Sequence, residues 1–342
     1  MEQQHPNLSL SHSIHACHQL TALAHSNFAP AFALLPHAKR QAMEILYAYT
    51  RFTDDLADLP DLDPAADNTP EVSIQRKKQK LNQWGGAVEA VLGKIGDETS
   101  PQIDPNDESA FQEIARRFPG CGGLIFLPAL KMIVNNYNIP RESLFPLIDG
   151  VKSDLNGKSF ATFDDCMEYC HQVATSVGFA SLAIWETTEP LFSEPVVKAA
   201  KACSIAFQWT NIMRDVREDY RNGRIYLPQS ELQHFGLTEQ QLGSIFEGAG
   251  ITAQMETKFL NLMAFQLDRC EGYYKNSIPL YRLIHRDSRR TFGLMWNCYY
   301  ALFQKICQSP LQITTEKRVR LSFCQKFRLW FRWHWMPCRT LR

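Results

Sequence analysis

Residues 208–228, with the sequence QWTNIMRDVREDYRNGRIYLP, place polar side chains along one face of an expected helix. Gln208, Asn211, Asp215 and Asp219 follow one another at spacings of 3, 4 and 4 residues, so they share one side of an α-helix. The preceding residues 196–207 are apolar and rich in alanine, which predicts a helix that is buried on most sides. Because buried carboxylates cost several kcal/mol unless cations or hydrogen bonds compensate them, this acidic face predicts a bound positive charge.

A second acidic stripe lies far upstream, in residues 47–58. Tyr47, Arg51, Asp54 and Asp58 are spaced 4, 3 and 4 residues apart, with Asp55 beside them. On a helix the Cβ atoms of residues four apart lie about 5 to 6 Å from each other, so two carboxylates can converge on one ion. We expect the two stripes to face each other across an apolar cavity.

Carboxylate and amide oxygens are hard ligands that suit Mg²⁺, which keeps water and substrate phosphates in its remaining positions. The cofactor expected here is therefore Mg²⁺, with Mn²⁺ as an alternative. The expected metal ligands are Asp54, Asp58, Asn211, Asp215 and Asp219. Arginines on or near the same stripes offer forked donors to phosphate oxygens, namely Arg51, Arg214 and Arg224.

Both stripes resemble motifs of the squalene/phytoene synthase family, whose members join two prenyl diphosphates through their C1 ends. The family's Tyr-x-x-x-Arg-x-x-Asp-Asp-x-x-Asp corresponds to residues 47–58. Its Asn-x-x-Arg-Asp-x-x-Glu-Asp, followed by Gly-Arg-x-Tyr-Leu-Pro, corresponds to residues 211–228. Many terpene cyclases share a bare Asp-Asp-x-x-Asp, whereas the long second motif is specific. The resemblance covers about residues 20–310 and implies an all-α isoprenoid-synthase bundle with a central apolar cavity.

A third segment, residues 169–178, resembles the family's Tyr-Cys-x-x-Val-Ala-Gly-x-Val-Gly, with Thr175 where a glycine is common. Small residues in the middle of a helix leave space on that face, which relatives use for the prenyl chain. On the last core helix, Tyr299 rather than Tyr300 is expected to face the pocket. Asp149 lies at the end of a family-like segment, residues 138–150, and Asp154 follows it. Loop capping is the favoured interpretation for both, and a catalytic role is the alternative.

The resemblance implies roles for the individual residues of these segments. The expected catalytic residues are Tyr47, Arg51, Asp54, Asp58, Tyr169, Asn211, Asp215 and Asp219. The expected substrate-binding residues are Ser26, Phe28, Asp55, Val173, Gly178, Gln208, Arg214, Glu218, Arg224, Tyr226 and Tyr299. Ser26 stands where relatives often have a basic residue, and capping of a helix is its alternative role.

The implied reaction begins with loss of diphosphate, whose developing charge metal and arginine can neutralise without proton transfer. Aromatic faces of Tyr47, Tyr169 and Tyr299 are expected to stabilise the allylic cation. The stretches at 27–28 and 53–58 look more like bacterial squalene-pathway members, which favours two farnesyl diphosphates and presqualene diphosphate or squalene. Phytoene from two geranylgeranyl diphosphates is the alternative. A need for NADPH stays open, and no nucleotide-binding fingerprint is present.

Two more distant alternatives are a single-substrate terpene cyclase and a non-catalytic assembly factor. The Gly-Arg-x-Tyr-Leu-Pro sequence at 223–228 argues against the first. The complete set of five motif aspartates argues against the second.

Composition limits the remaining possibilities. The 342 residues are 45% hydrophobic and carry a net charge of zero, which predicts a large core and no nucleic-acid partner. Ten scattered cysteines indicate reduced thiols, and the expected location is the cytoplasm. A peripheral position at the inner face of the membrane is the alternative. One domain is expected over 1–312, including polar loops and a surface helix at 59–109. The oligomeric state stays open.

The expected tail, residues 313–342, is basic and aromatic. From Glu316 onward one acidic residue stands against eight basic ones, Lys317, Arg318, Arg320, Lys326, Arg328, Arg332, Arg339 and Arg342. Tryptophans interleaved with basic residues are typical of a segment in a membrane interface. Packing against the body of the protein is the alternative interpretation.

Overall fold

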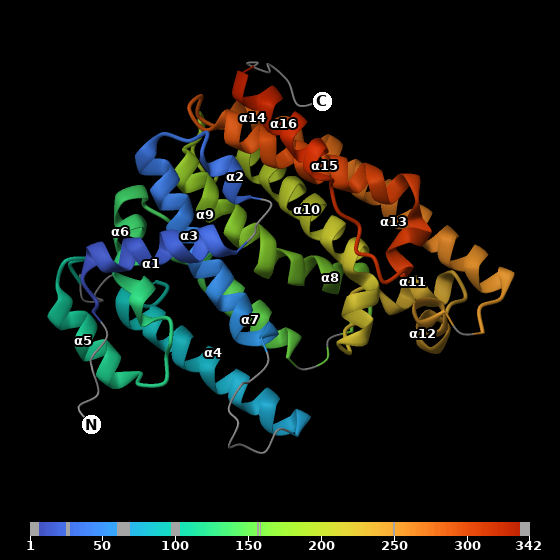
Figure 1. Cartoon of the computed structure of the whole chain (residues 1–342), viewed down its shortest axis with the longest axis horizontal. Coiled ribbons are helices and arrows are strands. Elements are labelled where there is room, and N and C mark those ends of the chain that lie inside the picture. Colours follow the sequence, from blue (N-terminus) through green and yellow to red (C-terminus); the bar gives the residue numbers. More distant parts are fainter. Residues whose placement is uncertain are drawn as a thin grey trace. The chain divides into compact units, whose positions relative to one another are not determined.

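The computed structural model describes residues 7–24, 28–59, 69–96, 103–155, 157, 159–248 and 250–335. The expected all-α class is confirmed, because these residues form helices α1 to α16 and short helical turns η1 to η4 (Figure 1). Within the described ranges, extended pairing is limited to two isolated bridges, Ser159 with Ile225 and Thr187 with Ile284. The chain divides into two compact units, one formed by 1–155 and 179–186, the other by 156–178 and 187–342.

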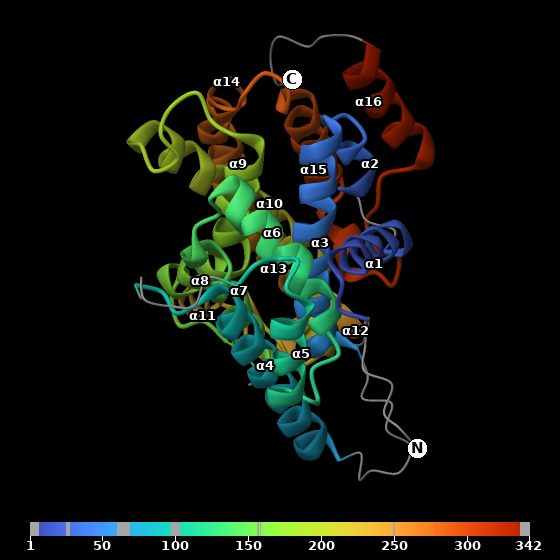
Figure 2. The same cartoon turned by 90° about the vertical axis from the view of Figure 1, so that its left-hand side faces the viewer.

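The first unit is built around α3 (His37–Asp58), on which α1, α4, α6 and α7 pack (Figure 1). Helix α4 also contacts α5 and α7 (Figure 2). The other elements of this unit are α1 (Leu10–Leu23), α2 (Ala29–Phe32), α4 (Pro70–Leu92), α5 (Glu108–Arg117), η1 (Leu124–Phe126), α6 (Leu127–Tyr137), η2 (Arg141–Ser143) and α7 (Phe145–Asp154).

Helix α3 begins directly after Pro36, whose fixed φ suits a helix start. Two buried polar side chains fix it against its neighbours. The Tyr49 hydroxyl donates to the Leu144 carbonyl at 2.9 Å, and the Trp84 indole Nε1 donates to Thr53 Oγ1 at 2.9 Å. Because these bonds satisfy groups that are costly to bury unpaired, they fix which face of α3 points into the core.

The second unit is built around α10 (Glu194–Arg221), which packs on α8, η3, α13, α14 and α15. Its other elements are α8 (Phe163–Cys170), η3 (His171–Thr175), the start of α9 (Ser176–Trp185), α11 (Gln229–His234), α12 (Glu239–Glu247), α13 (Ala253–Ser277), α14 (Leu280–Leu283), α15 (Arg289–Gln308), η4 (Pro310–Thr314) and α16 (Phe323–Trp335).

Helix α10 is buried on most sides, as its apolar sequence predicts. Ala206, Trp209, Thr210 and Met213 have no exposed surface, and Thr210 Oγ1 lies 2.9 Å from the Tyr274 hydroxyl. The helix ends at Arg221, and Gly223 follows with φ +73, a left-handed conformation that glycine adopts without strain. The glycine of the second motif therefore marks the end of α10, as the sequence predicts.

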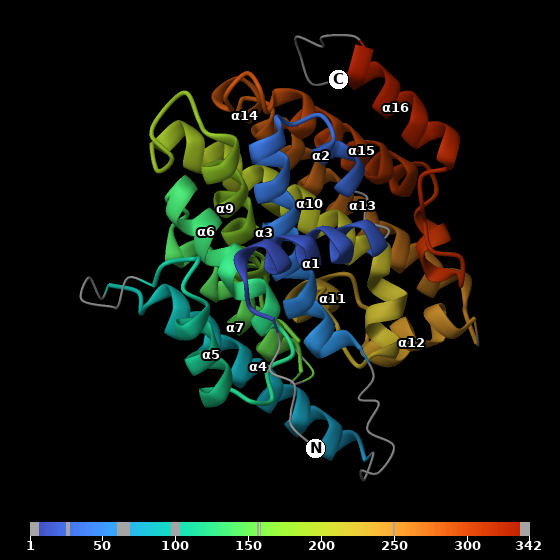
Figure 3. The ribbon, with the colours of Figure 1, turned by 60° about the vertical axis from the view of Figure 1, so that its left-hand side comes forward.

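The last helix, α16, lies alongside α15 (Figure 3). Its Trp333 is fully buried, so packing against the body is confirmed for this part of the tail. Among the described residues, no helix combines the length and the hydropathy needed to cross a bilayer.

Candidate active site

In the first unit, the acidic stripe lies on the last three turns of α3. Arg51 Nη2 pairs with Asp55 Oδ1 at 2.7 Å, one turn further along the helix. Burial acts against the charge of the guanidinium, but the neighbouring Asp55 carboxylate outweighs it and raises the pKa of Arg51. On the same helix, Tyr47 meets Phe32 of α2 edge to face, with ring centroids 6.3 Å apart.

Asp54 is the most perturbed carboxyl group on this stripe. Burial, and then the charge of Asp58 one turn away, raise the pKa of Asp54 to about 7, although Arg51 partly opposes the shift. Asp55 and Asp154 also contribute to the rise. The charge of Asp154, at the C-terminal end of α7, therefore acts on Asp54. Loop capping alone does not account for this contribution. An acidic cluster of this kind favours a bound cation.

In the second unit, Asn211 and Tyr299 meet on the polar face of α10. The Oδ1 atom of Asn211 is buried and accepts no hydrogen bond from any residue within the described ranges. Burial raises the pKa of Tyr299, while the charge of Arg214 and a hydrogen bond from Asn211 lower it. Tyr300, by contrast, points to Glu271 of α13, with a hydroxyl to Oε1 distance of 3.2 Å. Tyr299 is thus the tyrosine of α15 that lies beside the motif residues.

Asp215 is bound by two arginines. Arg214 donates from Nε to Oδ1 at 2.8 Å and from Nη2 to Oδ2 at 2.5 Å. Arg318 donates from Nε to Oδ1 at 2.7 Å and from Nη2 to Oδ2 at 2.6 Å. Burial by itself raises the pKa of Asp215, but these hydrogen bonds outweigh it and lower the pKa below its ordinary value.

Arg318 is a residue that the motifs do not identify. In the sequence it stands among the basic residues of the tail, and in the structure its side chain packs against α10. Its Nε also lies 3.8 Å from Glu218 Oε2, and nearby Glu316 pairs with Arg217 and Arg221 at 3.4 and 3.7 Å. Glu316 and Arg318 therefore contact residues of the second motif segment on α10 and belong to the candidate site.

An aromatic cluster lies beyond the C-terminal end of α10. Tyr169 and Tyr226 stack with centroids 5.2 Å apart and an interplanar angle of 24°, and their hydroxyls are 3.4 Å apart. Phe160 packs on both rings, at 5.5 and 6.0 Å. The structure thus brings together residues from two motifs that are 57 residues apart.

The residues after Tyr169 form a π-helical turn, η3, which contains Val173. Such turns widen a helix locally and often occur at functional sites. Gly178 lies in the first turn of α9, directly after η3. A Cβ atom at this position would lie 2.5 Å from Ser204 Oγ. In this structure the space in front of Gly178 is therefore filled by α10, and its contact with a prenyl chain stays a prediction.

The remaining expected site residues are placed as follows. Gln208 and Asp219 are half-buried on α10, Glu218 is exposed there, and Arg224 is half-buried just after the helix. The Arg224 backbone N–H donates to the Asp219 carbonyl at 2.8 Å. Phe28 precedes α2 and is half-buried. Ser26 lies outside the described residues.

Two observations fit a magnesium-binding role for these residues. The buried Oδ1 of Asn211 has no donor among the described residues, and a metal ion would supply the missing partner. Burial, and then the charge of Asp58, raise the pKa of Asp54, and a divalent cation would compensate both the burial of the carboxylate and its repulsion by Asp58. Asp215 can join such a site only if Arg318 gives up part of its contact, because the two arginines occupy both carboxylate oxygens.

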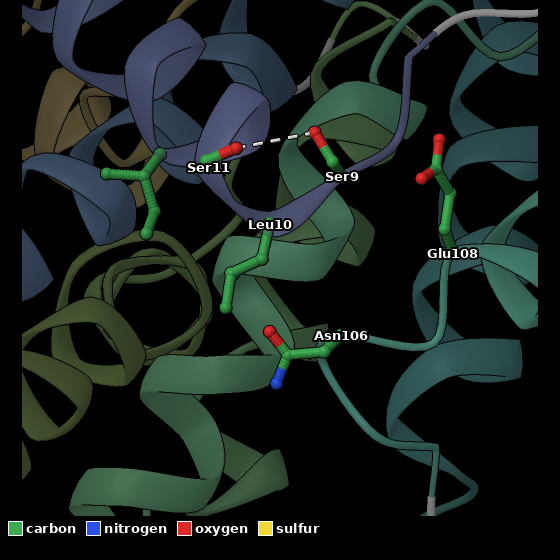
Figure 4. Close-up of a pocket in the computed structure, with 6 residues that line it drawn as sticks. Ser9, Leu10, Ser11, Asn106 and Glu108 are labelled. Atoms are coloured by element: carbon green, nitrogen blue, oxygen red, sulfur yellow. Dashed lines mark hydrogen bonds between the residues drawn. The ribbon is translucent and has the colours of Figure 1, made fainter.

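A separate shallow pocket, with a cavity volume of about 370 Å³, lies at the start of α1 (Figure 4). Its labelled lining residues are Ser9, Leu10, Ser11, Asn106 and Glu108, and the Ser9 and Ser11 hydroxyls lie 3.5 Å apart. The pocket contains no motif residue and a single charged side chain, so it is not the candidate active site.

The sequence profile of the squalene/phytoene synthase family matches residues 22–325. The 15-cis-phytoene synthase of Synechococcus elongatus is 30% identical over 292 residues, which cover 82% of this chain and 79% of that protein. The phytoene synthase of Arthrospira platensis is 32% identical over 316 residues, covering 90% of this chain and 88% of that protein.

Solved structures share the fold. A crystal structure of a dehydrosqualene synthase superposes with a TM-score of 0.68 at 23% identity and covers 95% of this chain and 96% of its own. The squalene synthase HpnC from Alicyclobacillus acidocaldarius gives a TM-score of 0.62 at 22% identity and covers 87% and 94%. With the profile match across most of its length, this chain belongs to the squalene/phytoene synthase family of prenyltransferases.

Proposed function

We propose that this protein condenses two prenyl diphosphates C1 to C1, with release of diphosphate, through a cyclopropyl diphosphate. The observation that carries the proposal is that each unit has a central helix on which carboxylates and arginines of a family motif lie together. In α3 these are Arg51, Asp54 and Asp58. In α10 they are Arg214 and Asp215, beside the amide of Asn211.

Asp54 and Asp58 are the proposed metal ligands for one diphosphate, and Asn211, Asp215 and Asp219 those for the other. Bound Mg²⁺ supplies positive charge to the leaving oxygen as the C–O bond breaks. Arg51, Arg214 and Arg224 are proposed to bind the phosphate oxygens, and Arg318 joins them because its guanidinium already lies on Asp215. These groups hold the departing electron pair on diphosphate without a proton transfer.

The allylic cation left behind needs a surface that excludes water and carries no nucleophile. The stacked rings of Tyr169 and Tyr226, with Phe160 packed on both, provide such a surface in the second unit. An aromatic face stabilises a nearby cation by about 0.5 to 2 kcal/mol. The double bond of the second prenyl chain then attacks the cation, and loss of one proton closes the cyclopropane ring.

Chain length separates two candidate products. The stretch at 53–58 favours two farnesyl diphosphates and presqualene diphosphate, with squalene as the product if NADPH reduces it. The relatives from Synechococcus elongatus and Arthrospira platensis, named as phytoene synthases, favour two geranylgeranyl diphosphates and phytoene. Both candidates share the condensation step and the proposed ligands.

The test is incubation of the purified protein with Mg²⁺ and either farnesyl or geranylgeranyl diphosphate, with and without NADPH, followed by identification of the lipid. A C30 or C40 product settles the chain length. A cyclised single-substrate product would identify a terpene cyclase, and no diphosphate release from either substrate would identify a non-catalytic relative.

Matched variants test the residue roles. Asp54→Ala and Asp215→Ala are each expected to abolish turnover with helical content unchanged, whereas Asp268→Ala, on the exposed face of α13, should retain it. Because both carboxylates serve the same turnover, the double variant should be no slower than the worse single variant. Full activity of either single variant would contradict the metal assignment.

A further inference from the structure

Helix α16 presents a continuous row of aromatic side chains to solvent. Phe323, Phe327, Phe331 and Trp335 recur every four residues and are 82%, 53%, 45% and 65% exposed. Successive ring centroids lie 6.3 to 6.4 Å apart. The helix of 13 residues is about 20 Å long, so this aromatic row forms one extended apolar strip. Contiguous exposed apolar surface of this kind marks an interaction site.

The orientation of the aromatic row is fixed by Trp333. This side chain has no exposed surface, and its ring lies against Gly293 of α15, where any Cβ atom would overlap it. Trp333 also packs edge to face on Tyr281, with centroids 5.8 Å apart. Rotating α16 to bury the aromatic row would pull Trp333 out of this position. The row is therefore held outward.

Basic residues border the aromatic row. At about 100° per residue, Arg328 and Arg332 project beside the row, on the side away from Trp333, and both are exposed. Residues 323–335 contain these two arginines and Lys326 but no acidic residue. The outer face of α16 is thus apolar along one strip and cationic along the next.

We propose that this face of α16 binds the interface of an anionic lipid bilayer. The four aromatic rings would lie at the boundary between headgroups and acyl chains, where aromatic side chains concentrate. Arg328 and Arg332 would bind lipid phosphates, whose negative charge attracts basic segments. A second copy of this chain fits less well, because it would bring the arginines of both copies together without an acidic partner on α16.

The test is flotation of the full-length protein with vesicles of pure phosphatidylcholine or of phosphatidylcholine mixed with phosphatidylglycerol. The wild type is expected to float with the anionic vesicles, and less so at high salt. Phe327→Ser/Phe331→Ser should weaken binding at least roughly tenfold. Arg328→Gln/Arg332→Gln should weaken it roughly thirtyfold on anionic vesicles. Phe192→Ser removes an aromatic ring that is 62% exposed elsewhere in the same unit, and it should bind as the wild type does.

All variants keep Trp333, so their circular dichroism and thermal midpoints should match the wild type. Absence of flotation with either vesicle, or unchanged binding of Phe327→Ser/Phe331→Ser, would overturn the proposal. A wild-type dimer that this double variant converts to a monomer, without vesicle binding, would instead identify a self-association face. Diphosphate release from detergent-dispersed substrate should be unchanged in the double variant, so loss of membrane binding and loss of the proposed reaction can be told apart.

Discussion

Arg318 binds Asp215 through two parallel hydrogen bonds, although the two residues are 103 positions apart in the chain. Arg214 binds the same carboxylate from the adjacent position. Two guanidinium groups bind this one carboxylate, and Glu218 Oε2 lies 3.8 Å from Arg318 Nε as a weaker second partner. Paired bidentate arginines are well suited to transfer part of their hydrogen bonding to phosphate oxygens.

Arg318→Ala is therefore expected to lower kcat/KM for the prenyl diphosphate by roughly 100-fold, the loss typical of one donor to a developing anion. Arg318→Lys keeps the positive charge but loses the paired N–H donors of the guanidinium, so its kcat/KM should lie between those of the wild type and Arg318→Ala. The measurement is the initial rate of diphosphate release at varied substrate and magnesium concentrations.

The adjacent Lys317 is also exposed, and Lys317→Ala serves as the control with near wild-type rates. The result for Arg318→Ala that would contradict a role in catalysis is an unchanged kcat/KM, with half-maximal rate reached at a lower magnesium concentration. This result would show that Arg318 competes with the metal for Asp215.

Asp54→Asn is expected to stabilise the metal-free protein while abolishing turnover. The pKa of Asp54 is raised to about 7 in the folded state, so this carboxyl group ionises more easily in the unfolded chain, and ionisation favours unfolding. A shift of about three pKa units corresponds to roughly 4 kcal/mol, and partial solvent access reduces this to roughly 2 to 4 kcal/mol. A neutral asparagine carries no such penalty. The native aspartate would thus be a residue that serves function at a cost in stability.

The pH dependence of this difference has a defined sign. Since the folded-state pKa is the higher one, the contribution of Asp54 to stability is full below about pH 4 and is lost as pH rises through about 7. In urea unfolding with a chelator present, the free energy of unfolding of Asp54→Asn should therefore rise relative to that of the wild type between these pH values. The exposed Asp268→Asn is the control and should show no such rise. An equal free energy of unfolding at pH 8 would contradict the buried, repelled carboxylate.

The two central helices could be predicted because their signals are local. The spacings within 47–58 and 208–219 follow the helical repeat, and Pro36 and Gly223 mark where α3 begins and where α10 has ended. Tyr299 could be chosen over Tyr300 because its segment resembles the family's last core helix, and a helix puts the two adjacent tyrosines on different faces. Its position beside Asn211 and Arg214 agrees with that choice.

Arg318 and Asp154 lay beyond such reasoning because their contacts are tertiary. Arg318 lies in the non-helical segment between η4 and α16, where no periodicity indicates which way a side chain points. Its basic neighbours made a shared surface role the simpler interpretation. Asp154 ends α7, and whether a terminal carboxylate caps a loop or reaches a neighbouring helix depends on packing that the sequence does not encode locally.

Gly178→Ala tests whether this glycine serves packing or the prenyl chain. An added Cβ would lie 2.5 Å from Ser204 Oγ, and we expect overpacking to cost roughly 1 to 3 kcal/mol of unfolding free energy. Gly178→Ala/Ser204→Ala removes the obstructing oxygen and should restore most of it, while Ser204→Ala alone should have little effect. If the double variant regains stability but not turnover, Gly178 also lines the path of the substrate. If Gly178→Ala is already as stable as the wild type, Gly178 of α9 and Ser204 of α10 do not approach each other this closely.

Trp333→Ala is expected to detach α16 from α15. Removing a fully buried tryptophan costs roughly 3 to 5 kcal/mol, but α16 contributes little else to the core, so limited proteolysis should cleave within residues 323–335 before the rest of the chain unfolds. Gly293→Ala should have the same effect from the other side of the contact, because its methyl group overlaps the indole ring. Trp335→Ala, which removes an indole that is 65% exposed, is the matched control and should leave both the cleavage rate and the thermal midpoint unchanged in solution. Equal protease resistance of Trp333→Ala and the wild type would mean that the helix is held by other contacts, and the fixed orientation of the aromatic row would then need another cause.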